Sequence, residues 1–243
     1  MGEVRRFADL EALSQAAAED IVTLAREAAA VRGTCHIALS GGSTPRTLFR
    51  ILRELPMPWP DVELWWGDER TVPPDHADSN YRMAAEKLIE PLGLTRVHRM
   101  HGEERPAVAA AAYEQKLVVT LGDPPVLDIA LQGLGSDGHT ASLFPHSPAL
   151  SETERWVVAN PVDSPLAGGK TTRLTLTARA IAACRHVRFL VAGADKAHAL
   201  AAVLEGPRDP MRVPAQLVAD APDVLWYVDE AAASQLQDQG ART

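Results

Sequence analysis

The feature that most constrains the fold of this chain is an alternation of helical stripes with short strands that are apolar on both faces. Residues 10–28 repeat apolar side chains at spacings of three and four, which predicts an amphipathic helix. The runs at 35–39, 62–66 and 127–135 are short and strongly apolar. Strands of this kind, separated by helices, are typical of a parallel sheet covered on both sides. We therefore expect an α/β fold with a mostly parallel central sheet and helices on both faces.

Further segments continue the alternation. We expect helices opened by Pro45, with Ser43 or Thr44 as the cap, and at about 79–90, 105–121 and 195–205. Strands are expected near 155–160, 172–177, 186–193 and 224–228. The segment 161–171 is predicted to be a mobile loop, and the chain from Ala231 a terminal helix that frays. Because no Pro/Gly/Ser-rich linker divides the chain, we expect residues 1–243 to form a single domain.

Charge and composition narrow the classes of function. The formal net charge of −8 argues against a nucleic-acid partner, but a small phosphorylated ligand needs only a few local cations. No apolar run approaches the ~20 residues of a membrane span, and the N-terminus lacks an apolar signal region, so we expect a cytoplasmic protein without a membrane partner. Cys35 and Cys184 are interpreted as buried free thiols. The sequence contains neither H-E-x-x-H nor a Cys/His cluster, so no metal or other cofactor is expected.

The first candidate site is the turn after strand 35–39. It consists of Ser40, Gly41, Gly42, Ser43 and Thr44, with Arg46 just beyond Pro45. In open parallel sheets, ligands collect beyond the carboxyl ends of the strands. The glycine pair lets the backbone approach a ligand, and the helix N-terminus presents free N–H groups and a partial positive charge. The turn therefore predicts a phosphate cradle; a capped turn without a ligand is the alternative.

The second candidate site, Asp68-Glu69-Arg70, follows strand 62–66. Adjacent charges at a strand end cannot all be buried without partners. The guanidinium of Arg70 could bind a phosphate or a carboxylate with two hydrogen bonds. A solvated loop with local ion pairs is the alternative reading of this segment.

The third candidate site is the glycine-rich segment 133–140, which carries Asp137 and His139. The glycines permit a tight turn that aims the imidazole outward, and Asp137 could orient that imidazole or bind substrate hydroxyls. Histidine is the side chain best suited to accept a proton near neutral pH. A hydrogen-bonded loop histidine is the alternative. Lys196 is a weaker candidate: the helix dipole disfavours a cation at a helix N-terminus, which suggests an external anion, although a solvated side chain fits equally.

Four segments in this order resemble known signatures: LSGGSTP, GDERTVPPDHADSNYRMA, GLGSDGHTASLFP and GADKAHAL. Together they resemble the 6-phosphogluconolactonase family, whose wider superfamily includes glucosamine-6-phosphate deaminases. The resemblance covers about residues 36–205. It implies a modified Rossmann-like three-layer α/β sandwich. It also implies hydrolysis of 6-phospho-D-glucono-1,5-lactone to 6-phosphogluconate in the oxidative pentose phosphate pathway.

The resemblance also assigns roles to residues. It places Gly41, Gly42, Ser43 and Thr44 on the phosphate loop. Arg70 matches a substrate- and phosphate-contacting arginine, His139 the catalytic histidine, and Lys196 a phosphate-binding lysine. Asp68 and Asp137 match acidic positions near the sugar, and Arg173 is a further substrate-binding candidate. The implied partner is a phosphorylated sugar lactone, bound by a monomer or small homo-oligomer.

One departure separates this chain from the deaminases. Their D-G-H is followed by a segment resembling I-A-F-N-E-P, whose glutamate partners the histidine, whereas residues 140–145 here read TASLFP. Arg70 likewise replaces a tyrosine of the deaminase pattern. Two rival functions stay open: a sugar-phosphate deaminase or isomerase, and a non-catalytic sugar-phosphate sensor. For the lactonase we expect His139 to act as general base on water.

Overall fold

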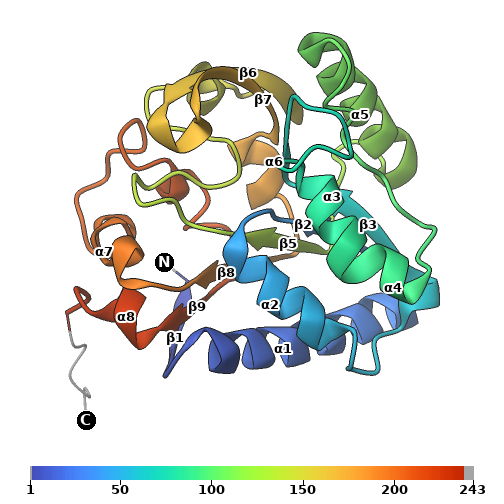
Figure 1. The fold of residues 1–243 in the computed structure, drawn as a ribbon, viewed down its shortest axis with the longest axis horizontal. Coiled ribbons are helices and arrows are strands. Elements are labelled where there is room, and N and C mark those ends of the chain that lie inside the picture. Colours follow the sequence, from blue (N-terminus) through green and yellow to red (C-terminus); the bar gives the residue numbers. More distant parts are fainter. Residues whose placement is uncertain (1, 238–243) are drawn as a thin grey trace.

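A six-stranded parallel sheet runs through the computed structural model, which describes residues 2–237 (Figure 1). The strand order is β1-β9-β8-β5-β2-β3, and every neighbouring pair is parallel. The strands are β1 (Glu3–Phe7), β2 (Cys35–Leu39), β3 (Val62–Trp66), β5 (Ile129–Gln132), β8 (His186–Val191) and β9 (Val224–Asp229). The prediction of a mostly parallel α/β sheet is confirmed. Strand β1 was not expected from the sequence.

A second sheet is antiparallel and has the order β4-β7-β6. It is built from β4 (Asp68–Arg70), β6 (Val157–Ser164) and β7 (Gly169–Leu176). The prediction of a loop at 161–171 is therefore wrong, because β6 and β7 pair as far as Ser164 and Gly169. Pro161 is tolerated in β6 because this strand lies at the edge of the sheet, where an N–H is not needed.

The helices are α1 (Leu10–Arg32), α2 (Ser43–Leu52), α3 (Asn80–Ala84), α4 (Glu90–Leu92), α5 (Pro106–Leu121), α6 (Ala178–Ala182), α7 (Ala197–Leu204) and α8 (Glu230–Ala233). A π-helical turn, Ala85–Ile89, joins α3 to α4. The long helix α1 begins where the Asp9 carboxylate accepts a hydrogen bond from the backbone N–H of Ala12, and ends at Gly33 with φ 77°. The predicted terminal helix begins one residue early, at Glu230, and ends at Ala233; the part of that prediction beyond residue 237 lies outside the described residues.

Helix α2 begins at Ser43, two residues before Pro45. Its N-cap is Gly42, with φ 103°, and no side chain in the described part of the chain caps the helix. The prediction that Ser43 or Thr44 is the cap is wrong, because both residues lie inside the first turn. Among residues 2–237, the first-turn N–H groups of α2 therefore have no side-chain acceptor.

The layers are visible in Figure 1, where α1 and α2 lie on one side of the central sheet and β6, β7 and α5 on the other. The core between them includes the fully buried rings of Trp65, Trp66 and Trp226. Phe189 of β8 stacks on Trp226 of β9, with ring centroids 3.8 Å apart. Cys35 and Cys184 are buried free thiols, as predicted. No helix within residues 2–237 has the length and apolar character to cross a membrane.

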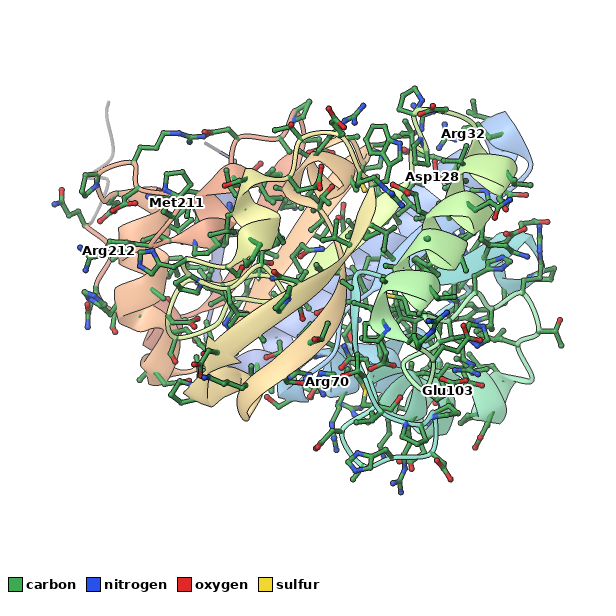
Figure 2. All side chains as sticks on the ribbon, turned by 90° about the horizontal axis from the view of Figure 1, so that it is seen from above. Arg32, Arg70, Glu103, Asp128, Met211 and Arg212 are labelled. Atoms are coloured by element: carbon green, nitrogen blue, oxygen red, sulfur yellow. The ribbon has the colours of Figure 1, made fainter. Side chains whose placement is uncertain are left out.

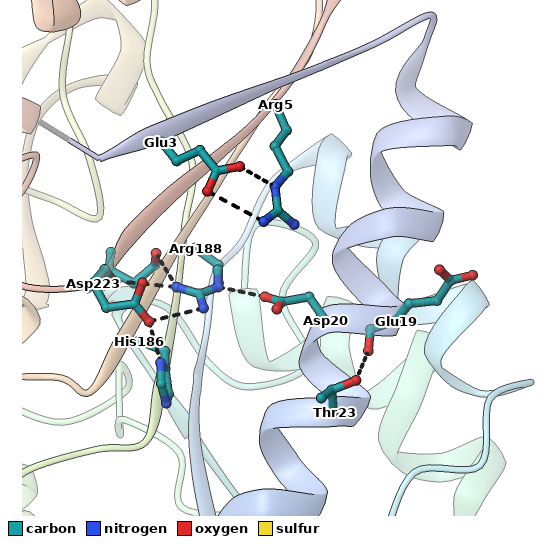
Figure 3. Close-up of polar contacts among 9 residues, drawn as sticks. Glu3, Arg5, Glu19, Asp20, Thr23, His186, Arg188 and Asp223 are labelled. Carbon is teal, nitrogen blue, oxygen red and sulfur yellow. Dashed lines mark hydrogen bonds and ion pairs between the residues drawn. The ribbon is translucent and has the colours of Figure 1, made fainter.

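Ion pairs that include the buried side chains of Arg188 and Asp128 connect elements at the end of the sheet where the strands begin; Figure 3 shows those of Arg188. Arg188 of β8 donates to Asp20 of α1, Nε to Oδ2 2.6 Å, and to Asp223 ahead of β9, Nη2 to Oδ2 3.2 Å. Asp128, ahead of β5, pairs with Arg32 at the end of α1 at 2.7 Å. Figure 2 shows Asp128 and Arg32 across the molecule from Arg70. The opposite edge, where the strands end, is therefore left for the candidate site.

Candidate active site

A cleft of about 200 Å³ lies at the carboxyl ends of β2, β5 and β8. Four of the segments singled out from the sequence contribute to its wall. The lining comprises Ser40–Pro45, Asp68, Arg70, Asn80, Gly133–Gly135, His139, Ala141, Leu190–Ala192 and Lys196. The glycine turn and the imidazole of His139 therefore open onto the same space. This is the location that ligands favour in parallel sheets.

The glycine turn of this cleft joins the end of β2 to the uncapped N-terminus of α2. Gly41 has no room for a side chain, because a Cβ there would lie 1.8 Å from Oδ1 of Asn80. Gly42, with φ 103°, holds a backbone conformation that side chains rarely adopt. Free N–H groups and the positive end of the α2 dipole face the cleft, an arrangement that favours an anion.

Asp68 and Arg70 line the cleft from β4. The carboxylate of Asp68 is only 8% exposed; its Oδ2 accepts from Ser142 Oγ at 2.6 Å and its Oδ1 from Asn80 Nδ2 at 3.1 Å. The guanidinium of Arg70 donates to the carbonyl oxygen of Asp78. This hydrogen bond directs the arginine side chain along the loop that follows β4. Arg70 is partly exposed, so it remains accessible to a ligand.

Glu69, between these two residues, was not assigned a role from the sequence. Its carboxylate is 2% exposed and accepts four hydrogen bonds: from the N–H groups of Arg70 (2.7 Å), Asn80 (2.8 Å) and Tyr81 (2.8 Å), and from Ser79 Oγ (3.0 Å). Burial raises the pKa of Glu69, and the backbone donors partly oppose that rise. Glu69 therefore fixes β4 to the start of α3. Strand alternation is the signal that could have found it, since neighbours in a strand point to opposite faces.

His139 and Asp137 form a hydrogen-bonded pair, with Nδ1 and Oδ1 2.6 Å apart. Asp137 Oδ1 also accepts from the backbone N–H of His139 at 3.1 Å. Burial alone would raise the pKa of Asp137, but the hydrogen bond and charge of His139, together with backbone donors, lower it below the usual 3.8. The side chain of His139 is 20% exposed, and its Nε2 has no hydrogen-bond partner within residues 2–237. That nitrogen is free to exchange a proton with a bound molecule.

Lys196 reaches the cleft from the 3₁₀ turn Ala194–Lys196, just before α7. Its Nζ lies 3.0 Å from Oδ2 of Asp195, so a neighbouring carboxylate already balances part of its charge. The lysine side chain is 26% exposed. A cation and the N-terminus of α2 therefore line the same cleft, and both favour a bound anion.

Three of the predicted residues do not line the cleft. Asp137 contacts His139 and reaches the site only through it. Arg46 lies on α2 and is exposed. Arg173 of β7 is 9% exposed, and its Nη2 donates to the carbonyl oxygen of Ala167 at 2.8 Å. Burial, followed by the charge of Arg70, lowers the pKa of Arg173. Within residues 2–237, no group of three or more His, Cys, Asp or Glu side chains is arranged to hold a metal ion.

Known proteins resemble this chain in sequence and in fold. The family described as glucosamine-6-phosphate isomerases/6-phosphogluconolactonase matches residues 8–226. A 6-phosphogluconolactonase of Synechocystis sp. is 38% identical over 224 residues, which cover 89% of this chain and 91% of the relative. The solved 6-phosphogluconolactonase of Trypanosoma cruzi superposes with a TM-score of 0.86 at 31% identity, covering 98% of this chain and 97% of that one.

A solved monomeric glucosamine-6-phosphate deaminase shares the fold, with a TM-score of 0.80 at 24% identity over 96% of this chain and 99% of that one. The scaffold alone therefore does not separate the two chemistries, and the side chains of the cleft have to do so. The match over residues 8–226 and the 38% identity to a curated relative nevertheless fix the family. This chain belongs to the glucosamine-6-phosphate isomerase/6-phosphogluconolactonase family.

Proposed function

We propose that this protein is a carboxylic ester hydrolase that opens 6-phospho-D-glucono-1,5-lactone to 6-phosphogluconate, the lactonase step of the oxidative pentose phosphate pathway. Relatives that align with nearly the whole chain carry the name 6-phosphogluconolactonase. One observation carries the proposal: an imidazole with a free Nε2 opens onto the same cleft as an uncapped helix N-terminus and a lysine. This combination suits a phosphorylated substrate that needs a base at its far end.

In this mechanism the phosphate binds between the glycine turn, Arg70 and Lys196. The N–H groups of α2 and the two cations supply charge-assisted hydrogen bonds to its oxygens. Binding energy from this remote group orients the ring carbonyl carbon, C1, toward His139. Ser43 and Thr44 line the same turn, and their hydroxyl groups serve as further donors to the phosphate.

The hydrolysis itself uses His139 as general base. Nε2 takes a proton from water while the water oxygen bonds to C1, giving a tetrahedral adduct. Asp137 accepts from Nδ1–H, holds the imidazole orientation and stabilises the imidazolium. The bond between C1 and the ring oxygen then breaks, and the imidazolium returns its proton to that departing oxygen. Arg70 and backbone N–H groups of the glycine-rich segments are candidates to stabilise the carbonyl oxygen as charge develops on it.

The side chains around His139 favour this chemistry over deamination. The partner of Nδ1 is Asp137, two residues before the histidine, and no glutamate contacts the imidazole within the described residues. Thr140, which follows His139, is 1% exposed, and its hydroxyl bonds to Oε1 of Gln132 at 2.8 Å. The glutamate-dependent proton relay of the deaminase pattern therefore has no counterpart here. Ammonia release from glucosamine 6-phosphate would overturn this assignment.

The decisive experiment measures acid release from freshly prepared 6-phosphogluconolactone by pH-stat or NMR, with the spontaneous opening of the lactone subtracted. General-base assistance is worth about 10²–10⁴-fold, so His139→Ala should lose kcat by that order while its circular dichroism stays native. Wild-type turnover by His139→Ala would remove the imidazole from the mechanism. Tight binding of 6-phosphogluconate without any turnover by the wild-type protein would favour the sensor instead.

We further propose that residues 1–243 form a single domain and that the protein is a cytoplasmic monomer or small homo-oligomer. The only partner proposed is the phosphorylated lactone. Sedimentation of the purified protein would test the oligomeric state directly.

A further inference from the structure

The imidazole of His139 is supported on its face by the ring of Phe144. The ring centroids are 4.2 Å apart and the planes differ by 25°, so the rings are stacked. The hydrogen bond to Asp137 fixes only one edge of the imidazole, at Nδ1. The terminal torsion of a histidine is broad, so a single bond at one edge leaves the ring free to tilt. A ring against its face removes that freedom and keeps Nε2 directed at the cleft.

Phe144 does not belong to the main core. It is 3% exposed, and with Val162 and Ala167 it forms a separate hydrophobic cluster. Val162 lies on β6, and Ala167 lies in the 3₁₀ turn Pro165–Ala167 at the tip of the β6–β7 hairpin. Figure 1 shows this hairpin on the side of the central sheet away from α1 and α2. The antiparallel hairpin therefore sets the position of Phe144.

The tip of the hairpin is itself held by Arg173. Its Nη2 donates to the carbonyl oxygen of Ala167, 2.8 Å away, and the side chain is nine-tenths buried. Arg173 stands opposite Arg70 in the pairing of β7 with β4. The residue expected from the family resemblance to bind substrate thus contacts the apolar cluster beneath the catalytic imidazole.

Ser142 fixes the segment between the two rings. Its N–H donates to Thr175 Oγ1 at 3.2 Å, its carbonyl oxygen accepts from Asn160 Nδ2 at 2.8 Å, and its hydroxyl donates to Asp68 Oδ2 at 2.6 Å. These partners come from β7, β6 and β4, so all three strands of the second sheet hold the segment. A buried serine with every polar group satisfied is rigid.

We infer that Phe144 is a positioning residue for His139 and that the β4–β7–β6 sheet is the support that holds it there. The inference rests on the proposed role of His139 as general base. The parallel sheet supplies the strand ends of the cleft, and the antiparallel sheet fixes the plane of the imidazole. Without the stacked ring, Nε2 points at the substrate for a smaller fraction of the time, and the chemical step slows while phosphate binding is unchanged.

The test replaces Phe144 by leucine, which keeps apolar bulk and removes the ring. Phe7→Leu is the matched control, because it removes a ring stacked at 5.9 Å on Tyr227 in the β1–β9 pair, and neither of these two rings lines the cleft. Steady-state kinetics, thermal unfolding and the imidazole C–H resonances of His139 are measured for both. If Phe144→Leu does not fold, Phe144→Met, with a flexible side chain that fills irregular space, takes its place.

We expect Phe144→Leu to lower kcat about tenfold, equivalent to about 1.4 kcal/mol, with KM within about twofold of wild type. The His139 resonances should lose the upfield shift that a stacked ring causes. Phe7→Leu should keep the wild-type kcat even if its Tm falls by as much as that of Phe144→Leu. Equal kcat in Phe144→Leu and Phe7→Leu, or unmoved His139 resonances in Phe144→Leu, would overturn the inference. A wild-type protein without lactonase activity would refute the proposed function instead, and the resonances would still decide the positioning role.

Discussion

Replacing Gly135 by alanine tests the pairing of His139 with Asp137 in the most direct way. A Cβ at this position would lie 2.0 Å from Nδ1 of His139 and 2.7 Å from Oδ1 of Asp137. Gly135 does not have a left-handed backbone conformation, so alanine introduces no backbone strain there. The substitution therefore acts through one methyl group placed between the two side chains that the mechanism joins.

The size of the effect follows from that geometry. Non-bonded heavy atoms rest roughly 3.5 Å apart, so the imidazole has to move by about 1.5 Å. A shift of that size breaks the 2.6 Å contact between Nδ1 and Oδ1 and turns Nε2 away from the substrate. Misplacement by about 1 Å can cost on the order of 10²-fold in rate, which is about 2.7 kcal/mol of activation free energy. We expect kcat of Gly135→Ala to fall by that order, with KM changed little.

The assay is the initial rate of lactone opening, corrected for spontaneous hydrolysis and read beside circular dichroism. Gly67→Ala is the matched control, because a Cβ there would meet its nearest neighbour, the carbonyl oxygen of Leu39, at an ordinary 3.5 Å. Gly67 lies between β3 and β4 and does not line the cleft. If Gly135→Ala turned over within about threefold of wild type, a rigid His139–Asp137 pair would not be needed for catalysis.

Two further predictions concern binding and pH. Lys196→Ala removes a charged partner of the phosphate. Because hydrogen bonds to charged groups are worth about 1.5–3 kcal/mol, KM should rise roughly 10- to 100-fold with kcat nearly unchanged. An unaltered KM would exclude Lys196 from the phosphate site. The hydrogen bond from Arg99 holds the pKa of Glu103 at about 2, against 4.5 for the free group. Because the folded-state pKa is lowered, the stability from this pair is fully present above pH 4.5 and is lost as pH falls toward 2. In Glu103→Gln the decline of Tm across that range should be shallower; a slope equal to that of wild type would contradict the assignment.

The parallel sheet could be predicted because its signals are local. The strands at 35–39 and 62–66 occur at the residues where the sequence places them, since each is a short apolar run followed by glycine within three residues. Strand β1 was missed because Glu3–Phe7 is polar and mostly exposed, and it becomes a strand only by pairing with the buried β9. Tertiary context decides such edge strands.

The antiparallel sheet could not be predicted for a related reason. Strand β4 has three residues, Asp68–Arg70, all charged, and its partner β7 lies about a hundred residues later in the chain. Three residues are too few to show a period of two. The sequence of either strand alone also does not indicate a partner that lies so far away in the chain. The proline and glycines of 161–171 indicate a loop by composition, yet this segment forms the end of a hairpin, where residues 162–164 pair with residues 169–171.

Apolar periodicity, glycine turns and the two-residue spacing of Asp137 and His139 are short-range properties, so the α/β class and the segments that carry chemistry could be recognised along the chain. Which of those groups share a space depends on the three-dimensional fold. It brought the ends of β2, β5 and β8 to one cleft, directed Glu69 away from that cleft, and turned Arg173 of β7 toward Ala167 at the tip of the β6–β7 hairpin. The physical reason is that parallel pairing aligns strand ends from distant parts of the chain, and burial then selects which side chains of each strand face the ligand.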